Sequence, residues 1–318
     1  MTCFDVFNGD ADGICSLLQL RLAKPIEAVL VTGAKRDVAL LDRVPAQRGD
    51  AVTALDISVD ANRAALLSLL DRGVTVQYFD HHFAGAVPEH PGLEAHIDTS
   101  PGVCTGILVD RYLKGSQRVW AIVAAFGDDL DQQATDLAKS MSLSCDRVAA
   151  LKELGRNIAY NAYGDSEADL IAAPSTLYRS LRRHTDPFRF MHAEAVFGEL
   201  GEARRSDLSQ ARTIAPAVMS EHAAIYVLPD APWARRVRGA LANELASASP
   251  DRAHAVVAPS GQGAYTVSVR APRKRASGAD ALCRQFSSGG GRMAAAGINC
   301  LPADQLADFV RRFEQMFC

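Results

Sequence analysis

The sequence predicts an α/β protein with an N-terminal parallel-sheet domain, a helical connector and a smaller C-terminal α/β domain. Short apolar runs alternate with helix-like stretches up to residue 80, and strand-like runs return after residue 215. Apolar runs separated by amphipathic helices favour parallel strands, because parallel strands need long crossover connections. The length of 318 residues also exceeds that of most single domains, so we expect two cores.

The first domain is expected to begin with strands and helices in strict alternation. The predicted strands are 2–7, 27–33, 51–57 and 74–80, and the predicted helices are 13–23, 38–44 and 62–73. Ligands of such sheets bind beyond the carboxyl ends of the strands. Polar residues that directly follow these strands are therefore expected to share one crevice.

The rest of the chain is expected to contain a connector and a second domain. Residues 138–214 are helical and polar, and little in them resembles a core of their own. We therefore predict a catalytic domain over 1–137, a helical connector over 138–214 and a second domain over 215–318. In the last part, three strand-like runs and one helix-like run predict a small α/β domain. These strand-like runs are 222–230, 254–260 and 264–272, and the helix-like run is 233–246.

The composition excludes several classes of protein. Hydrophobic residues make up 48% and charged residues 22%, as in ordinary globular domains, and no apolar stretch is long enough to span a bilayer. The first residues lack the basic and apolar regions of a secretory signal. Seven cysteines without a C-x-x-C pair indicate reduced thiols, so we expect a cytoplasmic protein. A net charge of −3 gives no general attraction to nucleic acid.

Acidic residues follow two of the expected strands. Asp10 and Asp12 lie two positions apart in a glycine-containing turn, where the tight backbone can aim both carboxylates at one point. Asp56 ends the third strand. Each residue alone is common at a turn or at a helix N-terminus. Because parallel strands end at the same edge of the sheet, the three carboxylates together favour a cation site.

Three ionisable residues directly follow the fourth strand: Asp80, His81 and His82. A mixed set of carboxylates and imidazoles suits manganese, iron or zinc better than magnesium or calcium, because imidazole prefers transition metals. Several carboxylates around one or two such ions are compatible with in-line displacement at phosphorus, in which the metal activates water. The sequence therefore predicts a hydrolytic metal site.

In this order, the segments GDADG, LDIS, FDHH and FGDDLD resemble the motifs of the DHH phosphoesterase superfamily. The C-terminal segment SSGGGRMAAAG is similar to the glycine-rich signature of the DHH-associated domain, which in that family binds the substrate and closes over the metal site. The resemblance covers both ends of the chain. The order of the motifs, the intact D-H-H and the terminal signature together make it specific.

The resemblance implies one or two manganese ions, with magnesium or cobalt as alternatives. The implied ligands are Asp10, Asp12, Asp56, His81 and Asp128, and Asn8 is the closest match to a first-motif His or Asp. Asp56 would bridge two ions, and Asp129 or Asp131 could serve in place of Asp128. A neutral amide at Asn8 binds metal less strongly than a carboxylate, which leaves occupancy by a second ion open.

The resemblance also implies roles in catalysis and in substrate binding. His82 would contact the scissile phosphate, and Asp80 would orient a neighbouring histidine. The implied substrate-binding residues are Arg270, Gly289, Gly290, Gly291 and Arg292. Arg292 replaces the usual histidine of the signature, and its fork of donors suits a phosphate or a guanine edge.

Two further features of the C-terminal part allow alternatives. The glycines at 289–291 suit close approach of a backbone to an anion, and a flexible loop is the alternative. Six basic residues make this part locally basic: Arg235, Arg236, Arg238, Arg273, Lys274 and Arg275. The first three are expected on a solvated helix face, and the other three beside an anionic ligand.

We therefore predict a manganese-dependent phosphodiesterase that converts short nucleotides, such as linear pGpG or very short oligoribonucleotides, to mononucleotides. The chain has no room for the additional modules of long-strand exonucleases in the superfamily. The alternatives are a 3′-phosphoadenosine 5′-phosphate phosphatase and a nucleotide-binding protein without turnover, the second suggested by Asn8 and Arg292. Neither a membrane nor long duplex nucleic acid is expected as a partner, and a homodimer is compatible with the sequence.

Overall fold

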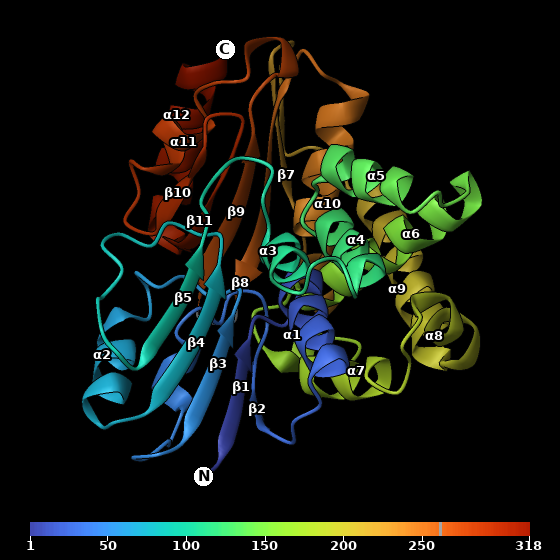
Figure 1. The fold of residues 1–318 in the computed structure, drawn as a ribbon. Coiled ribbons are helices and arrows are strands. Elements are labelled where there is room, and N and C mark those ends of the chain that lie inside the picture. Colours follow the sequence, from blue (N-terminus) through green and yellow to red (C-terminus); the bar gives the residue numbers. More distant parts are fainter. Residues whose placement is uncertain (261–262) are drawn as a thin grey trace. The chain divides into compact units, whose positions relative to one another are not determined.

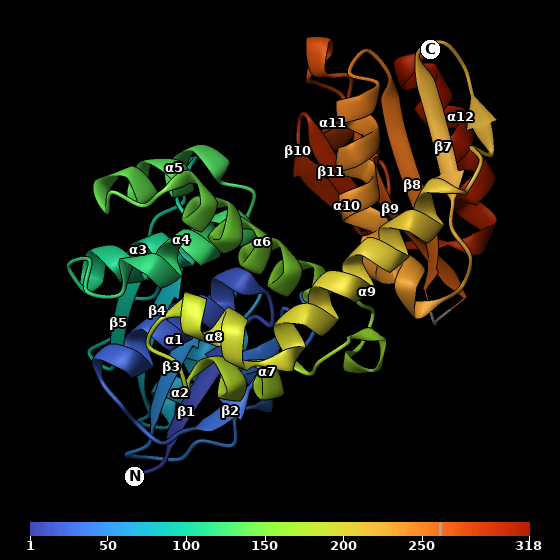
Figure 2. The same cartoon turned by 90° about the vertical axis from the view of Figure 1, so that its right-hand side faces the viewer.

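The computed structural model describes residues 1–260 and 263–318 (Figure 1). The chain divides into two compact units, Met1–Gly201 and Glu202–Cys318. Each unit contains its own β-sheet with helices packed against it (Figure 2). The predicted α/β class, with a parallel sheet first and a second sheet near the C-terminus, is therefore confirmed. Among the described residues, no helix combines the length and the apolar character needed to cross a membrane.

The first unit is built on a five-stranded parallel sheet with the strand order β2-β1-β3-β4-β5. The strands are β1 (Cys3–Phe7), β2 (Val29–Val31), β3 (Ala51–Leu55), β4 (Thr75–Asp80) and β5 (Leu93–Ile97). The sequence did not predict β5, whose residues are at most half-buried and give no apolar run. The run 38–44 forms only the short 3₁₀ helix η1 (Leu40–Arg43), because Pro45 disfavours helical backbone at the residue before it.

Helices cover both faces of this sheet. Side chains of a strand point alternately to its two faces, so each strand contributes to two cores. Phe7, Leu55 and Phe79 lie in the larger core, which α1 (Ala11–Ala23), α3 (Thr105–Tyr112) and α4 (Arg118–Gly127) cover. Their neighbours Val6, Ala54 and Tyr78 lie in the other core, together with α2 (Arg63–Asp71) and η1. The sheet is thus buried on both sides, as parallel sheets require.

Much of the segment expected to be a connector belongs to the core of the first unit. Its helices are α5 (Asp131–Ser140), α6 (Cys145–Ala162), α7 (Pro174–Leu181), α8 (Pro187–Ala193) and α9 (Ala195–Arg212), with the short 3₁₀ helix η2 (Glu167–Asp169) before α7. Leu151, Leu154 and Ile158 of α6 are fully buried in the same core as Trp120 of α4. The two units divide inside α9, after Gly201, rather than at residues 137 and 214.

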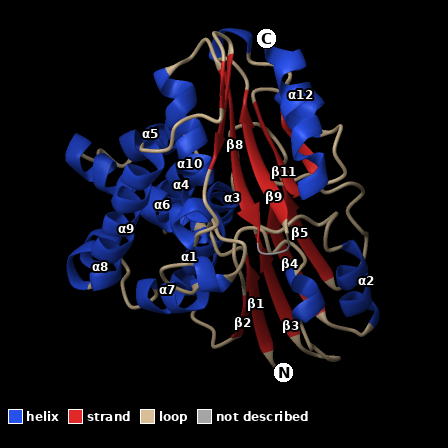
Figure 3. Ribbon diagram, turned by 180° about the vertical axis from the view of Figure 1, so that it is seen from behind, coloured by secondary structure: helices blue, strands red, loops and turns tan. Residues whose placement is uncertain are grey.

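The second unit contains a six-stranded mixed sheet with the order β10-β11-β9-β8-β7-β6. Figure 3 shows its neighbouring strands β8, β9 and β11. Its strands are β6 (Val218–Met219), β7 (Ala223–Val227), β8 (Ala253–Ser260), β9 (Ala264–Arg270), β10 (Gly289–Arg292) and β11 (Ala295–Pro302). Its helices are α10 (Pro232–Ala248), α11 (Ala279–Cys283) and α12 (Leu306–Phe317), with the 3₁₀ helices η3 (Arg273–Arg275) and η4 (Ala303–Gln305). Among the described strands of this sheet, only β7 and β8 pair in parallel. Val267, Phe309 and Phe313 lie in its core.

A buried ion pair ties α1 to the first sheet. The guanidinium of Arg21 donates two hydrogen bonds to the carboxylate of Asp5 in β1 and one, at 3.0 Å, to the hydroxyl of Thr53 in β3. Both charged side chains are nearly inaccessible to solvent. A buried charge is tolerated only when it is paired and hydrogen-bonded, so this contact fixes how α1 packs on the sheet.

We predict that Arg21→Met lowers the free energy of unfolding of the first unit by about 3–5 kcal/mol, because it leaves the Asp5 carboxylate buried without its partner. The double variant Asp5→Leu/Arg21→Met should recover much of this loss, since no unpaired charge remains. Urea denaturation followed by circular dichroism measures both effects. A single variant as stable as the wild type would contradict the prediction.

Candidate metal centre

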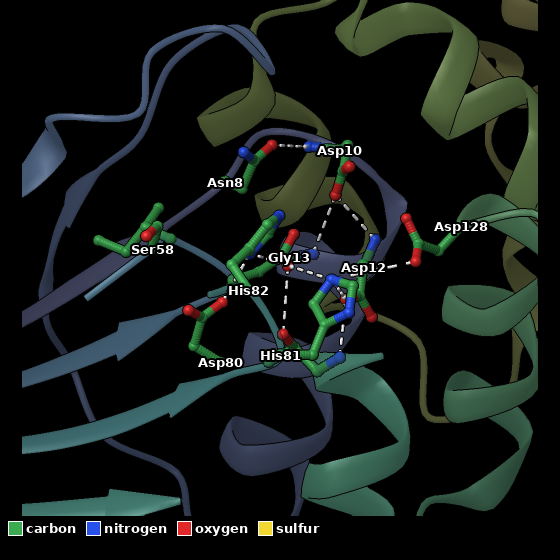
Figure 4. A network of polar contacts seen from close by, with 12 residues as sticks. Asn8, Asp10, Asp12, Gly13, Ser58, Asp80, His81, His82 and Asp128 are labelled. Atoms are coloured by element: carbon green, nitrogen blue, oxygen red, sulfur yellow. Dashed lines mark hydrogen bonds and ion pairs between the residues drawn. The ribbon is translucent and has the colours of Figure 1, made fainter. Parts of the chain in front are cut away.

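The carboxyl ends of β1, β3 and β4 and the C-terminus of α4 meet at one pocket in the first unit (Figure 4). Among the residues that line it are Asn8, Asp10, Asp56, His81, His82 and Asp128. They come from four segments that are far apart in the sequence. The expected convergence of strand ends is therefore confirmed.

The first turn of α1 holds two of the carboxylates in different ways. Asp10 caps the helix, because its Oδ1 accepts hydrogen bonds from the backbone N–H groups of Asp12 at 3.0 Å and Gly13 at 3.1 Å. Asp12 instead accepts the backbone N–H groups of Thr105 at 2.8 Å and Gly106 at 2.7 Å. These groups form the N-terminus of α3, whose partial positive charge stabilises a buried anion.

The contact between Asp12 and α3 depends on a glycine. A Cβ atom at Gly106 would lie 2.4 Å from the Cβ of Ala124 in α4 and 3.2 Å from Oδ1 of Asp12. No side chain fits there without displacing α4 or the carboxylate. Gly106 thus allows α3, α4 and α1 to meet directly beneath the pocket.

Asp56 is held in an uncommon backbone conformation. Its φ of 58° lies in the left-handed region, which aspartate adopts more readily than most residues. Its backbone N–H donates to the carbonyl of Phe79 at 3.0 Å, and its Oδ1 accepts a hydrogen bond from the hydroxyl of Thr105 at 3.1 Å. Burial and the charges of Asp12 and Asp10 raise the pKa of Asp56 well above its ordinary value. Such crowded carboxylates favour a bound cation.

His81 lies between three carboxylates. Its Nε2 atom is 3.5 Å from Oδ1 of Asp56, 3.9 Å from Oδ2 of Asp12 and 3.9 Å from Oδ2 of Asp128. These distances exceed ordinary hydrogen bonds. Ligands that each lie about 2.1 Å from one ion are separated by about 3.0–4.2 Å, depending on the angle at the metal. Each of these three distances is therefore compatible with two ligands of one divalent transition-metal ion.

A second histidine stands beside this group. Possible ligand atoms of Asp56, His81 and His82 lie within 4.8 Å of one another. Nδ1 of His82 forms a 2.7 Å hydrogen bond with Oδ1 of the fully buried Asp80, so Nε2 is the nitrogen left for a ligand. Burial alone would lower the pKa of His82, but the hydrogen bond and the charge of Asp80 raise it above its ordinary value. Asp80 thus orients His82 and favours its protonated form.

Asp128 is the residue of the fourth motif that lines the pocket. It directly follows α4, and burial, outweighing the opposing charge of Lys35, raises its pKa to about 6. The carboxylate of Asp131 instead pairs with Lys152 at 2.7 Å and Arg156 at 3.1 Å, and Asp129 is exposed. Of the three alternatives that the sequence left open, the structure therefore favours Asp128.

Lys35 and Thr105 belong to the site although the sequence analysis did not single them out. Lys35 follows β2, and its Nζ lies 2.5 Å from Oδ2 of Asp10 and 3.9 Å from Oδ1 of Asp128. Burial alone would raise the pKa of Asp10, but the charge and hydrogen bond of Lys35 lower it to about 2. The one signal for Lys35 was its place after a predicted strand, at the same edge of the sheet as the motifs.

Asn8 lines the pocket, but its side-chain amide holds the surrounding backbone. Its Oδ1 accepts the backbone N–H of Asp10 at 3.1 Å, and its Nδ2 donates to the carbonyl of Lys35 at 3.3 Å. The residue therefore links the turn after β1 to the segment after β2. This contact gives Asn8 a structural role, whereas its role as a metal ligand stays a prediction.

Comparison with known proteins identifies the fold. No family model matches the sequence, and no curated protein matches it. Among solved structures, the exonuclease RecJ bound to manganese matches with a TM-score of 0.65 and 18% identity over 99% of this chain and 89% of that one. The DHH domain of a member of a family of ribosomal proteins matches with a TM-score of 0.68 and 14% identity over 99% and 86%.

A third match is the pGpG-specific phosphodiesterase PggH from Vibrio cholerae, with a TM-score of 0.55 and 14% identity over 99% of both chains. The chain has the DHH phosphoesterase fold. Asp10 and Asp12 of GDADG, Asp56 of LDIS, and Asp80, His81 and His82 of FDHH lie at or beside the pocket together with Asp128. In this DHH fold the four motifs recognised in the first unit thus form one constellation, and the roles of its members stay predictions.

The residues expected to bind substrate lie in the second unit. Gly289, Gly290, Gly291 and Arg292 form β10, an edge strand paired with β11, and not a flexible loop. A Cβ atom at Gly289 would lie 1.7 Å from the carbonyl oxygen of Cys283, so close packing on α11 explains this glycine. Nε of Arg270 donates to Oδ1 of Asn243 at 2.7 Å. Their roles toward a substrate stay predictions.

The basic residues of the second unit are less solvated than expected. Arg236 is buried and pairs with Asp207 at 2.7 Å, and Arg238 is buried as well, so the expectation of a solvated helix face is wrong for both. α10 presents these residues to the interior of the unit. Lys274 pairs with Asp251 at 2.8 Å. Ion pairing thus reduces the positive charge available to an anionic ligand.

We predict that Asp56→Asn weakens manganese binding by more than about 100-fold, since even residues that only support a ligand commonly contribute about 10- to 100-fold. Isothermal titration with manganese chloride measures the dissociation constant. Asp131→Asn is the matched control, because it removes a carboxylate outside the pocket and should bind manganese like the wild type. Equal affinities for the two variants would exclude Asp56 from the ligand set.

Proposed function

We propose that the protein is a manganese-dependent phosphodiesterase that hydrolyses linear dinucleotides such as pGpG, or very short oligoribonucleotides, to mononucleotides. The observation that carries this proposal is the arrangement of His81 at 3.5–3.9 Å from the carboxylates of Asp12, Asp56 and Asp128. A mixed set of carboxylates and imidazole favours manganese over magnesium. The match to a pGpG-specific phosphodiesterase supports the substrate class.

The residues around His81 and His82 have separate tasks in the proposed reaction. Asp12, Asp56, His81 and Asp128 would hold the manganese, which when bound neutralises phosphate oxygens and activates water for in-line attack. Asp80 holds His82 at Nδ1, so the imidazolium presents Nε2 as a hydrogen-bond donor to the scissile phosphate. Thr105 fixes the carboxylate of Asp56 through its hydroxyl. Preorganised donors of this kind stabilise the negative charge that develops in the transition state.

An apolar rim beside the pocket favours a nucleotide over inorganic pyrophosphate. Val38 lines the pocket and is 49% exposed. Phe83, directly after His82, is 75% exposed, and its carbonyl accepts a 2.9 Å hydrogen bond from Ser58, which also lines the pocket. Exposed aromatic rings provide stacking surfaces for bases. The proposal therefore assigns to Phe83 the stacking of a base linked to the bound phosphate.

We place this activity in the cytoplasm. All seven cysteines are free, and thiols stay reduced in that compartment. Short nucleotides are the proposed partners, and neither a membrane nor long duplex nucleic acid is required. The alternatives, a 3′-phosphoadenosine 5′-phosphate phosphatase or a nucleotide-binding protein without turnover, give different products and are tested in the same assay.

We predict that the purified protein with manganese converts pGpG or another dinucleotide to mononucleotides, and that Asp56→Ala does not. The assay presents pGpG, pApA, a short RNA and 3′-phosphoadenosine 5′-phosphate, and separates the products by chromatography. Release of inorganic phosphate from the last compound alone would support the phosphatase alternative. Tight binding of a dinucleotide without turnover would support the binding protein.

We predict that Phe83→Ala raises KM for a dinucleotide and changes kcat much less, because stacking contributes roughly 1–3 kcal/mol per base, or about 5- to 150-fold. Leu67→Ala is the control, since Leu67 is an exposed apolar residue on α2 outside the pocket lining. Steady-state kinetics of the three proteins give both constants. An unchanged KM for Phe83→Ala would exclude a stacking role.

A further inference from the structure

The backbone of Lys35 is fixed from two sides. Its N–H donates to the carbonyl of Ala162, the last residue of α6, at 3.0 Å. Its own carbonyl accepts the hydrogen bond from Nδ2 of Asn8. The ammonium also lies 5.4 Å from the ring centre of Tyr163, a favourable distance for a cation over an aromatic face. The position of this charge is therefore built into the fold.

The ammonium of Lys35 and nearby backbone N–H groups contact the carboxylate and amide oxygens on one side of the pocket. Oδ2 of Asp10 accepts a hydrogen bond from the ammonium at 2.5 Å, while Oδ1 accepts hydrogen bonds from two backbone N–H groups. The amide oxygen of Asn8 accepts a backbone N–H as well. Oδ1 of Asp128 lies 3.9 Å from the same ammonium. A metal ion bound to Oδ2 of Asp10 at about 2.1 Å would stand next to the lysine charge, where the two repel strongly.

On the opposite side of the pocket, backbone N–H groups also donate to Asp12, but a histidine stands in place of the ammonium. There His81 stands 3.5–3.9 Å from its three carboxylate neighbours, a spacing that suits ligands of one shared ion. The pocket is thus divided into a part that suits a metal and a part that a lysine occupies. Asp128 faces both parts, because its two oxygens lie near His81 and Lys35 respectively.

We propose that the ammonium of Lys35 replaces the second metal ion, so that the centre binds one manganese ion per chain. Two-metal centres place ions about 3.5–4 Å apart and use both to stabilise the attacking and leaving oxygens. In this centre one manganese ion and one ammonium group would stabilise these oxygens together. The positive charge of Lys35 would stabilise the phosphate oxygens that the metal does not contact. The inference rests on the metal centre of the proposed function and not on the identity of the substrate.

The first test counts the metal. The full chain is equilibrated with manganese chloride alone, and bound manganese is measured by equilibrium dialysis with elemental analysis and by electron paramagnetic resonance. We expect saturation at one manganese per chain and the spectrum of isolated Mn(II). Saturation at two per chain, with the spectrum of a coupled pair, overturns the proposal. This result needs no substrate, so a failure of the proposed phosphodiesterase activity is recognised separately.

The second test removes the charge of Lys35. Lys35→Met should bind manganese at least as tightly as the wild type, because a competing cation has been removed from the carboxylates. If the enzyme turns over a dinucleotide, kcat of this variant should fall by about 100-fold at the manganese concentration that saturates the wild type. Lys152→Met, which removes a lysine paired with Asp131, is the matched control. Weaker manganese binding by Lys35→Met, or an unchanged kcat, contradicts the proposal.

Discussion

The concentration of buried negative charge at one edge of a parallel sheet is the constraint on which the first unit depends. Asp10, Asp12 and Asp56 are almost inaccessible to solvent, and each is stabilised by a different group. The N-terminus of α1 and Lys35 stabilise Asp10, the N-terminus of α3 stabilises Asp12, and Thr105 donates to Asp56. An unpaired buried carboxylate is costly, so these donors allow the folded chain to keep a strongly anionic pocket ready for a cation.

Rigid helix packing gives the pocket its dimensions. α1, α3 and α4 meet at Gly106, and the buried residues of α6 extend the same core. Side chains on packed helices and strand ends are held more precisely than those on free loops. Asp128 is carried by the end of α4, and Asp12 and Thr105 by the first turns of α1 and α3. The geometry of the pocket is therefore a property of the helical layer as much as of the sheet.

The sequence predicted the parts of the site that follow directly from strand ends. Asp10, Asp56 and His81 were placed together because parallel strands share a carboxyl edge. Lys35 could not be assigned, since its contact with Asp10 depends on a loop path that no periodicity reveals. The glycines of β10 looked like a loop, because a strand without side chains has no alternation, and its pairing with β11 is a tertiary contact. The helices after residue 138 looked polar because only part of each helix surface is apolar. That part completes a core formed by helices distant in the sequence, which the sequence alone does not reveal.

The backbone hydrogen bond between Lys35 and Ala162 also limits where the chain can be truncated. A fragment ending at residue 137, the expected end of the catalytic domain, would contain every DHH motif of the first unit but would lack α6 and Ala162. Its loop after β2 would lose the anchor that aims the lysine at Asp10, and its core would lose Leu151, Leu154 and Ile158. A fragment meant to keep the site therefore has to extend through α6, and the compact unit Met1–Gly201 contains this helix.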